Sequence, residues 1–217
     1  DNCTFSGNGL YSVSSAGGGG GPVSGGAVAL IPQAINVTAT PNVDFVFRRC
    51  VFMHNLAQGE GGAVSITPRS VSGSANMNAF SLQIDSCTFA DNHVVWPNGL
   101  SFNSNSLNSP YCGAAAVLVH FTLFASFVSR NITVFNSTFA GNGVTTAVGS
   151  DPFGGCYGGA MLISFYPSTP LHESWTAVSL QQSTFMNNYI VNRYSGGAGG
   201  AAVRARRDRR AVHRARA

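Results

Sequence analysis

Carboxylate and imidazole side chains are the residues of this chain that could perform acid–base chemistry. Enzymes that cleave polysaccharides place at least two carboxylates on one face, where one donates a proton and the other activates water or attacks the sugar. The acids of interest are Asp44, Glu60, Asp85, Asp91, Asp151 and Glu173. No two of them share a position of the repeat described below. His54 and Asp91 are predicted near neighbours on adjacent turns, as an acid–base couple or as a solvated surface contact.

Cysteine could supply metal ligands, a nucleophile or disulfides. Three cysteines lie two residues before a Phe, and serine takes the same place before two later Phe residues. These side chains are expected to stack in one column of the fold: Cys3, Cys50, Cys87, Ser137 and Ser183. Stacked cysteines can be bridged geometrically, but buried free thiols are the prediction because Ser substitutes without a change of partner. A bridge between Cys112 and Cys156 would tie two long loops. No CxxC, Cys/His or phosphate-loop spacing occurs, so no metal or cofactor is expected.

A repeated Phe-x-x-Asn phrase is the element that positions all these side chains. Four copies read CTFSGN, CTFADN, STFAGN and STFMNN. The repeat positions form a predicted Phe ladder, at Phe5, Phe52, Phe89, Phe139 and Phe185, and a predicted Asn ladder, at Asn8, Asn55, Asn92, Asn142 and Asn188. Amides stacked at strand spacing can hydrogen-bond along the axis, so these Asn side chains are predicted to be structural rather than catalytic.

A small-residue triplet alternates with each Phe-x-x-Asn phrase. The triplets begin at Gly25, Gly61, Cys112, Gly158 and Gly196. From a triplet to the next Phe the separation is 27, 28, 27 and 27 residues, whereas from Phe to the following triplet it is 20, 9, 23, 19 and 11. A constant segment alternating with a variable one indicates a stacked structural unit with loops of free length on one side.

Apolar alternation within a unit predicts short strands. Aligned on the Phe, the inward residues are Phe45, Leu82, Ile132 and Val178 at seven before it, and Phe47, Ile84, Val134 and Leu180 at five before it. This step of two is strand alternation, whereas the following step of three, to the Cys or Ser column, requires a corner or bulge. Each triplet opens another strand, as in Val28-Ala29-Leu30, Val64-Ser65-Ile66, Ala115-Ala116-Val117 and Met161-Leu162-Ile163.

Composition separates the repeat from the last residues. The chain has 217 residues, 26 Gly, no Lys and only 9% charged residues, which is typical of a turn-rich β-protein. Residues 204–217 hold seven Arg and one Asp, leaving residues 1–203 with five Arg and seven acids, a charge near −2. We expect a repeat domain over 1–203 and a disordered tail over 204–217. Nucleic-acid binding is not expected, since only the tail is basic.

The apolar run from Ala114 to Val128 is predicted to form two strands and their connection, because 15 residues are too few to span a bilayer. No membrane span is therefore expected in this sequence. Because the chain starts within a repeat and without Met, it is expected to be part of a longer array.

The alternation of GGAV, GGAV and GGAM with the Phe-x-x-Asn phrases resembles the repeat of chlamydial polymorphic outer-membrane proteins. That repeat also occurs in other large surface or secreted proteins. The resemblance covers residues 1 to about 203. It implies an all-β fold, a right-handed single-stranded parallel β-helix of about five units, exposed outside the cell or at its surface, with adhesion as the leading activity.

Two functions follow as expectations. The first is a non-enzymatic β-helix that acts as adhesin, recognition surface or spacer toward cell-surface or matrix glycans or proteins, with residues 9–24, 93–111 and 143–157 as its variable face. The alternative is a carbohydrate-active lyase or hydrolase with its catalytic turns absent or unrecognised. Stacked carboxylates on one face would favour the enzyme, and an acid-poor face with projecting loops would favour the binder.

Overall fold

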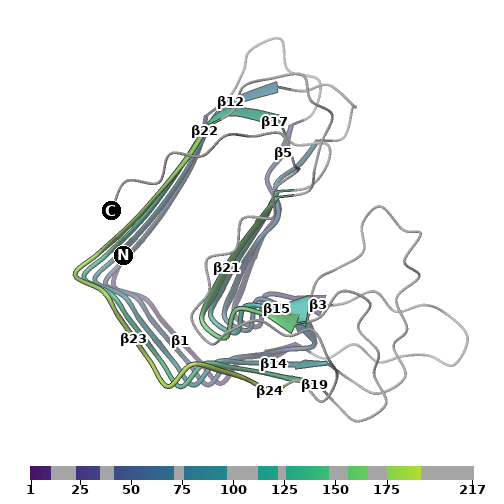
Figure 1. Ribbon diagram of the computed structural model, residues 1–217, viewed down its shortest axis with the longest axis vertical. Coiled ribbons are helices and arrows are strands. Elements are labelled where there is room, and N and C mark those ends of the chain that lie inside the picture. Colours follow the sequence, from purple (N-terminus) through teal and green to yellow (C-terminus); the bar gives the residue numbers. More distant parts are fainter. Residues whose placement is uncertain are drawn as a thin grey trace, which may run out of the picture.

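The computed structural model describes residues 1–10, 23–34, 42–70, 76–96, 112–121, 126–146, 156–165 and 175–191. All regular structure in these ranges is β, and the strands pair in parallel within stacked sheets. Strands from successive repeats lie side by side, which supports the shape of a repeat solenoid (Figure 1). The fifth triplet, the tail over 204–217 and the acids Asp151 and Glu173 lie outside the described residues.

Two five-stranded sheets flank the Asn ladder. The Phe sheet contains β1 (Thr4–Ser6), β7 (Val51–Met53), β13 (Thr88–Ala90), β18 (Thr138–Ala140) and β23 (Thr184–Met186). The exit sheet, which the chain enters after each ladder Asn, contains β2 (Gly9–Leu10), β8 (Leu56–Ala57), β14 (His93–Trp96), β19 (Gly143–Thr146) and β24 (Tyr189–Val191).

Two four-stranded sheets and a short pair continue each unit. The return sheet contains β3 (Val23–Ser24), β9 (Gly59–Glu60), β15 (Cys112–Gly113) and β20 (Cys156–Tyr157). The triplet sheet contains β4 (Val28–Leu30), β10 (Val64–Ile66), β16 (Val117–Phe121) and β21 (Met161–Phe165). The short pair is β5 (Gln33–Ala34) with β11 (Arg69–Ser70).

The long sheet closes each unit and leads into the next Phe strand. It contains β6 (Asn42–Arg48), β12 (Asn76–Asp85), β17 (Ser126–Phe135) and β22 (Trp175–Gln181). We call the chain from one Phe-sheet strand through the following long-sheet strand a rung. Figure 1 shows the rungs superimposed, with the long sheet and the triplet sheet facing each other across the interior.

The predicted register of the Phe sheet and of the long sheet is confirmed by the strand pairing. In the Phe sheet, Phe89 pairs with Phe52 on one side and Phe139 on the other. In the long sheet, Ile84 pairs with Phe47 and Val134, as the alignment on the Phe requires. The apolar run near residue 120 likewise contains parts of two strands, β16 and β17. Equivalent residues therefore lie one rung apart.

Residues with positive φ form the corners of each rung. One column stands three residues before each ladder Phe, where φ lies between 47° and 55°: Asn2, Arg49, Ser86, Asn136 and Gln182. A second column directly precedes each ladder Asn, with φ between 50° and 66°: Gly7, His54, Asp91, Gly141 and Asn187. A left-handed residue reverses side-chain parity and turns the chain. The first column is the predicted corner between the long sheet and the Phe sheet, and the second column turns the chain from the Phe sheet into the exit sheet.

The third triplet corrects the sequence alignment. Val64 pairs with Val117, so the residues equivalent to Gly61-Gly62-Ala63 are Ala114, Ala115 and Ala116, two positions later than predicted. The strand that follows is Val117-Leu118-Val119, not Ala115-Ala116-Val117. CGA matches the GGA letters better, but the structure is set by burial of the apolar strand residues. Ala114 takes the left-handed corner, with φ 55° against 60° at Gly61.

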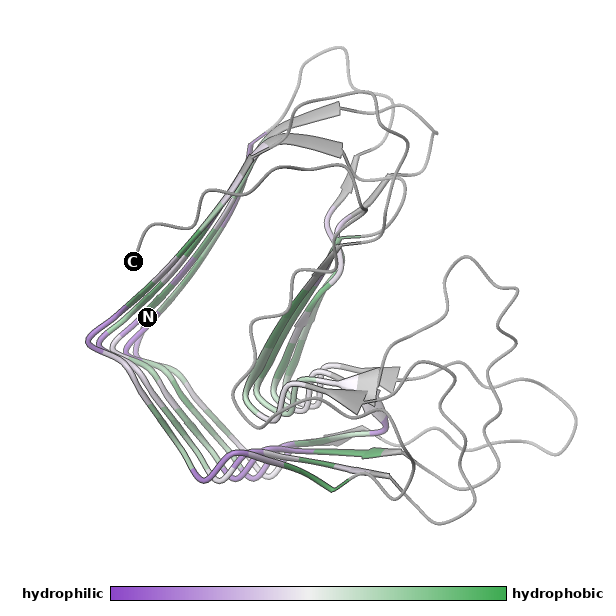
Figure 2. Cartoon of the chain, in the orientation of Figure 1, coloured by the Kyte–Doolittle hydropathy of each residue, from purple (hydrophilic) through white to green (hydrophobic). Residues whose placement is uncertain are grey.

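The interior is apolar and continuous between the sheets. The largest completely buried side chains include Phe52, Phe89 and Phe139 of the Phe ladder, together with Ile66 of the triplet sheet and Ile84 of the long sheet. These residues belong to one core cluster. Figure 2 shows the hydrophobic strands of the triplet sheet and hydrophilic residues at the corner between the long sheet and the Phe sheet.

Candidate functional site

The Phe ladder is a stack of parallel rings. The ring centroids of Phe52 and Phe89 lie 4.7 Å apart, and those of Phe89 and Phe139 lie 4.8 Å apart. The rings of these pairs are inclined by only 2° and 6°. Spacing of this kind follows the distance between paired strands. The completely buried ladder rings Phe52, Phe89 and Phe139 therefore stabilise the core of the stack.

The Asn ladder satisfies every hydrogen-bonding group of its buried amides. The Oδ1 atom of Asn92 accepts from the backbone N–H of Asn55 at 3.1 Å and from its Nδ2 at 2.8 Å. The Nδ2 atom of Asn92 donates back to the Phe52 carbonyl at 3.0 Å and forward to Asn142 Oδ1 at 2.9 Å. Asn92 is completely buried. This amide holds three rungs together and offers nothing to a substrate.

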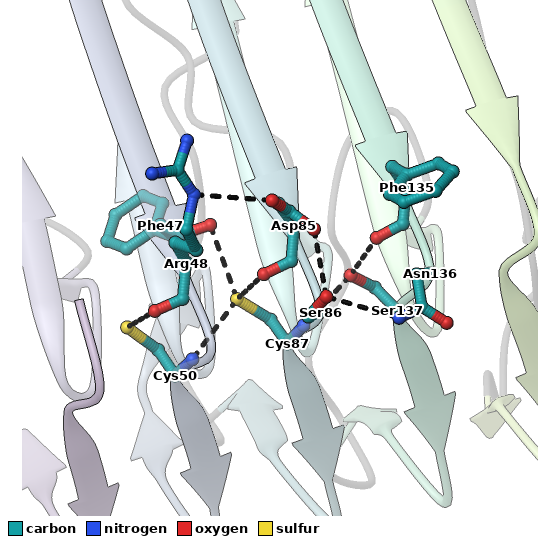
Figure 3. A network of polar contacts seen from close by, with 9 residues as sticks. All are labelled: Phe47, Arg48, Cys50, Asp85, Ser86, Cys87, Phe135, Asn136 and Ser137. Carbon is teal, nitrogen blue, oxygen red and sulfur yellow. Dashed lines mark hydrogen bonds and ion pairs between the residues drawn. The ribbon is translucent and has the colours of Figure 1, made fainter.

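The Cys and Ser column runs along the corner between the long sheet and the Phe sheet (Figure 3). Cys50, Cys87 and Cys3 are free thiols, and the first two are buried. The Cys50 N–H donates to Cys87 Sγ at 3.4 Å, and the Cys87 N–H donates to Ser137 Oγ at 3.0 Å. Sulfur and hydroxyl oxygen thus accept the same bond, which explains why Ser replaces Cys in later rungs.

Burial raises the pKa of the Cys87 thiol, and the bonds that the thiol forms partly offset this shift. The single S–H hydrogen of Cys87 is shared between the carbonyl of Asp85, 3.3 Å from Sγ, and that of Phe47, 3.4 Å from Sγ. A protonated, buried thiol that donates to carbonyls is a poor nucleophile. The column therefore serves packing, as the free-thiol prediction states, whereas Cys3 is exposed.

Asp85 belongs to a network of polar side chains at the corner between the long sheet and the Phe sheet. Arg48, one rung away, forms an ion pair with Asp85, with Nε 3.3 Å from Oδ2 (Figure 3). Asp85 Oδ1 accepts a hydrogen bond from Ser86 Oγ at 2.9 Å. Asn136 Nδ2 donates to the same Ser86 oxygen at 3.1 Å. Because Asp85 faces arginine rather than a second carboxylate, this arrangement lacks the acid pair of a glycosidase.

His54 and Asp91 stand at the same corner of adjacent rungs, as predicted, since their N–H groups make equivalent bonds to the next rung. Among the described contacts, no hydrogen bond or ion pair joins their side chains. Asp91 Oδ1 lies against Gly141, in the rung on the other side of Asp91 from His54. Within the described ranges, no three His, Cys, Asp or Glu side chains gather in a way that could hold a metal ion.

One buried arginine, Arg130, was not predicted from the sequence. Arg130 of β17 faces the interior beside Ile132 and Val134, and its guanidinium carbon lies 5.0 Å from the ring centroid of Phe121. Desolvation lowers the pKa of Arg130 to about 10, so the group stays charged at neutral pH. The signal available in the sequence was parity, because Arg130 is two residues before the inward Ile132.

An aromatic pair lies on the exit sheet, with Tyr189 exposed and His93 half-buried. The Tyr189 hydroxyl lies 3.4 Å from Nδ1 of His93, although β19 separates their two strands. Tyr189 reaches His93 across Gly143, where a Cβ atom would collide with the tyrosine ring. Tyr189 is 39% exposed. The side chains thus form a polar and aromatic surface that the sequence alignment did not single out.

The variable segments leave the repeat at the other ends of the exit strands: His93 is the first residue of β14, and Trp96 is its last. In the second rung, β8 and β9 are separated by Gln58 alone. In the first, third and fourth rungs the same step contains residues 11–22, 97–111 and 147–155, which lie outside the described residues. The flanking strands of the exit and return sheets are in register, so these segments start and end at one corner of the stack. The predicted variable face shares that corner.

The register also aligns Cys112 with Cys156 on adjacent strands of the return sheet. The sequence hypothesis of a bridge between two loops thus concerns two residues that the backbone brings to one position. The part of the chain that the structure describes contains no helix able to cross a membrane. Comparisons with protein-family models, curated proteins and solved structures found no match to this chain.

Proposed function

We propose that this chain is a right-handed parallel β-helix domain that acts outside the cell as a non-enzymatic recognition surface for glycans. Right-handed connection is the strong preference for parallel strands joined by crossovers, which supports the handedness. The resemblance of the repeat phrases to those of surface proteins supports the location.

The observation that carries the proposal is the pair of Tyr189, which is 39% exposed, and His93, which is half-buried, on the exit sheet. Tyrosine offers an apolar ring face and a polar hydroxyl at once, which suits a sugar with an apolar face and a rim of hydroxyls. Imidazole adds a donor or an acceptor on the same surface. The interior of the stack, in contrast, is filled by side chains that pack against one another.

The acid distribution favours binding over cleavage. In the described residues Asp85 is paired with Arg48, and the carboxylate of Asp91 lies against Gly141 rather than beside a second carboxylate. Cleavage of a glycosidic bond by the usual route requires two carboxyl groups roughly 5 to 10 Å apart. The alternative function is that of a carbohydrate-active enzyme, and the experiment below distinguishes it from binding.

The experiment applies the purified chain to a printed array of neutral and acidic oligosaccharides. We expect binding that falls on the order of tenfold in Tyr189→Ala, as the loss of an aromatic contact would produce. Phe135→Ala is the matched control, because Phe135 is 36% exposed but lies in the long sheet. No binding by the wild-type chain, or equal losses in the two variants, would contradict the proposal. New reducing ends released from an array sugar in solution would favour the enzyme.

A further inference from the structure

Two of the five cysteines stand outside the Cys and Ser column, and they occupy one position of neighbouring rungs. Cys112 begins β15 and Cys156 begins β20, and the two residues are direct partners in the parallel pairing of these strands. Successive ladder residues are 37 and 50 residues apart in the second and third rungs, so a rung offers many positions. Cysteines placed without a structural reason would rarely coincide in this way.

The corrected register of the third triplet is what brings these cysteines together. With CGA taken as the triplet, Cys112 would be equivalent to Gly158, two residues beyond Cys156. Two steps along a strand and one step across to its neighbour separate Cα atoms by about 8 Å, whereas a disulfide requires less than about 7 Å. In the observed pairing the two residues are directly opposite. Paired strands lie about 4.8 Å apart, within the Cα separation of about 4.4 to 6.8 Å that disulfides span.

The neighbouring positions of the return sheet contain no competing group. Gly113 pairs with Glu60, so the residue opposite Cys112 in the second rung is Gly59. Val23 pairs with Gly59 in the first rung. No other thiol or hydroxyl therefore stands next to Cys112 in the described part of this column.

The cysteines of the Cys and Ser column are bonded differently. Cys50 and Cys87 are buried free thiols, and their sulfur atoms each lie 3.3 Å from a carbonyl oxygen, of Arg48 and of Asp85 respectively. Ser137 continues that column because its Oγ accepts the N–H of Cys87 at 3.0 Å. A hydroxyl can thus do what the thiol does there. In the return sheet no serine takes the place of either cysteine.

We propose that Cys112 and Cys156 form a disulfide that joins the third and fourth rungs. The residues directly before them, 97–111 and 147–155, are two of the variable segments, so the bridge ties the chain together where both segments return to the stack. It also closes a loop of the unfolded chain, which reduces the conformations available to that state. The bridge does not depend on glycan binding, because it rests on strand pairing and thiol chemistry.

A small-molecule disulfide such as oxidised glutathione serves as the oxidant. The thiolate of one cysteine attacks a sulfur of oxidised glutathione, which forms a mixed disulfide and releases one glutathione thiol. The thiolate of the other cysteine then attacks the mixed disulfide, which forms the protein S–S bond and releases the second glutathione thiol. The two protein thiols lose two protons and two electrons, and the two released glutathione molecules gain them.

The experiment counts thiols after the folded chain has been equilibrated with oxidised and reduced glutathione. The chain is then unfolded in urea, alkylated and weighed by mass spectrometry. The wild type should carry three alkyl groups, because five cysteines less the two in the bridge leave three. Cys112→Ser and Cys156→Ser should each carry four, whereas Cys87→Ser, the matched control, should carry two. Five alkyl groups on the wild type, or glutathione attached in place of the bridge, overturns the inference.

Peptide mapping without reductant identifies the partners. Trypsin should release residues 70–130 and 131–193 as one linked pair, which separates when a reductant is added. Because residues 70–130 contain Cys87 as well as Cys112, the map is repeated on Cys87→Ser. The link should persist in that variant. Its loss would show that Cys87 is the partner of Cys156 and would contradict the proposal.

Thermal melting of the wild type decides the question if a serine variant fails to fold. Reduction of the bridge should lower the melting temperature by about 5 °C or more, because the unfolded chain regains its conformational freedom. The same reductant should leave the melting temperature of a folded Cys156→Ser protein unchanged. A wild type that melts at the same temperature with and without reductant contradicts the bridge.

Discussion

Asn55 and Asn92 are 37 residues apart in the chain, yet Nδ2 of Asn55 lies 2.8 Å from Oδ1 of Asn92. Both side chains are completely buried, and each is held from above and below. In a low-dielectric interior such a bond is strong, and a missing partner is costly. The Asn ladder therefore connects successive rungs through buried hydrogen bonds, and the Phe ladder connects them through ring stacking.

Replacing Asn92 with Ala should lower the free energy of unfolding by about 3 kcal/mol or more, because buried donors of Asn55 and the Phe52 carbonyl lose their partners. Urea denaturation followed by circular dichroism measures the change. Asn8→Ala is the control, because Asn8 is exposed at the end of the ladder and should cost about 1 kcal/mol. Equal losses at the two positions would show that burial does not set the cost.

Replacing Phe89 with Ala should lower the free energy of unfolding by about 3 to 5 kcal/mol, because it removes a buried ring and leaves a cavity between Phe52 and Phe139. Phe135→Ala should cost less than about 1 kcal/mol, since that side chain is 36% exposed. The same urea titration compares them. A Phe89→Ala protein as stable as Phe135→Ala would contradict the stacked core.

Replacing Ala114 with Gly should raise the free energy of unfolding by about 0.5 kcal/mol, because Ala114 has φ 55° and Gly adopts that conformation without strain. The methyl group lost from the contact with Leu118 offsets part of the gain. Ala116→Gly, at a buried position without positive φ, should instead destabilise by about 1 kcal/mol. Thermal melting of both variants checks the opposite signs.

The stability of the wild type should fall with rising pH above the ordinary thiol pKa of 9.0, because burial raises the pKa of Cys87. The unfolded chain releases its proton there while the folded chain keeps it, so the stabilising contribution is present below pH 9.0 and is lost as pH rises through the raised pKa. Cys87→Ser should remove this part of the slope. Urea midpoints of both proteins between pH 8 and 11 measure it.

A thiol-labelling experiment is the control for that prediction. Iodoacetamide should modify the exposed Cys3 rapidly and the buried Cys50 and Cys87 only after urea is added, with sites mapped by mass spectrometry. Rapid labelling of Cys87 in the folded chain would contradict its burial.

The stacking of equivalent residues could be predicted from the sequence because the inner positions accept so few side chains. Phe52, Phe89 and Phe139 are equivalent by letter and by place, and the parity change before each of them required the corner that Ser86 and Asn136 form with positive φ. Position 114 could not be assigned from letters, because Ala is small enough for a corner and CGA looks more like GGA than AAA does.

The spacing of Phe, Asn and small residues by itself determined that like segments stack. A buried ring or amide that contacts its equivalent one strand away can be replaced by few other side chains, so the repeat stays visible in the sequence. Only the tertiary structure decided the register of the third triplet, the contact of Tyr189 with His93 across a glycine, and the turning of Arg130 toward Phe121. Those relationships join residues that share no sequence motif. They depend on side-chain sterics and on desolvation, which are set only once the strands have paired and the side chains have been brought together.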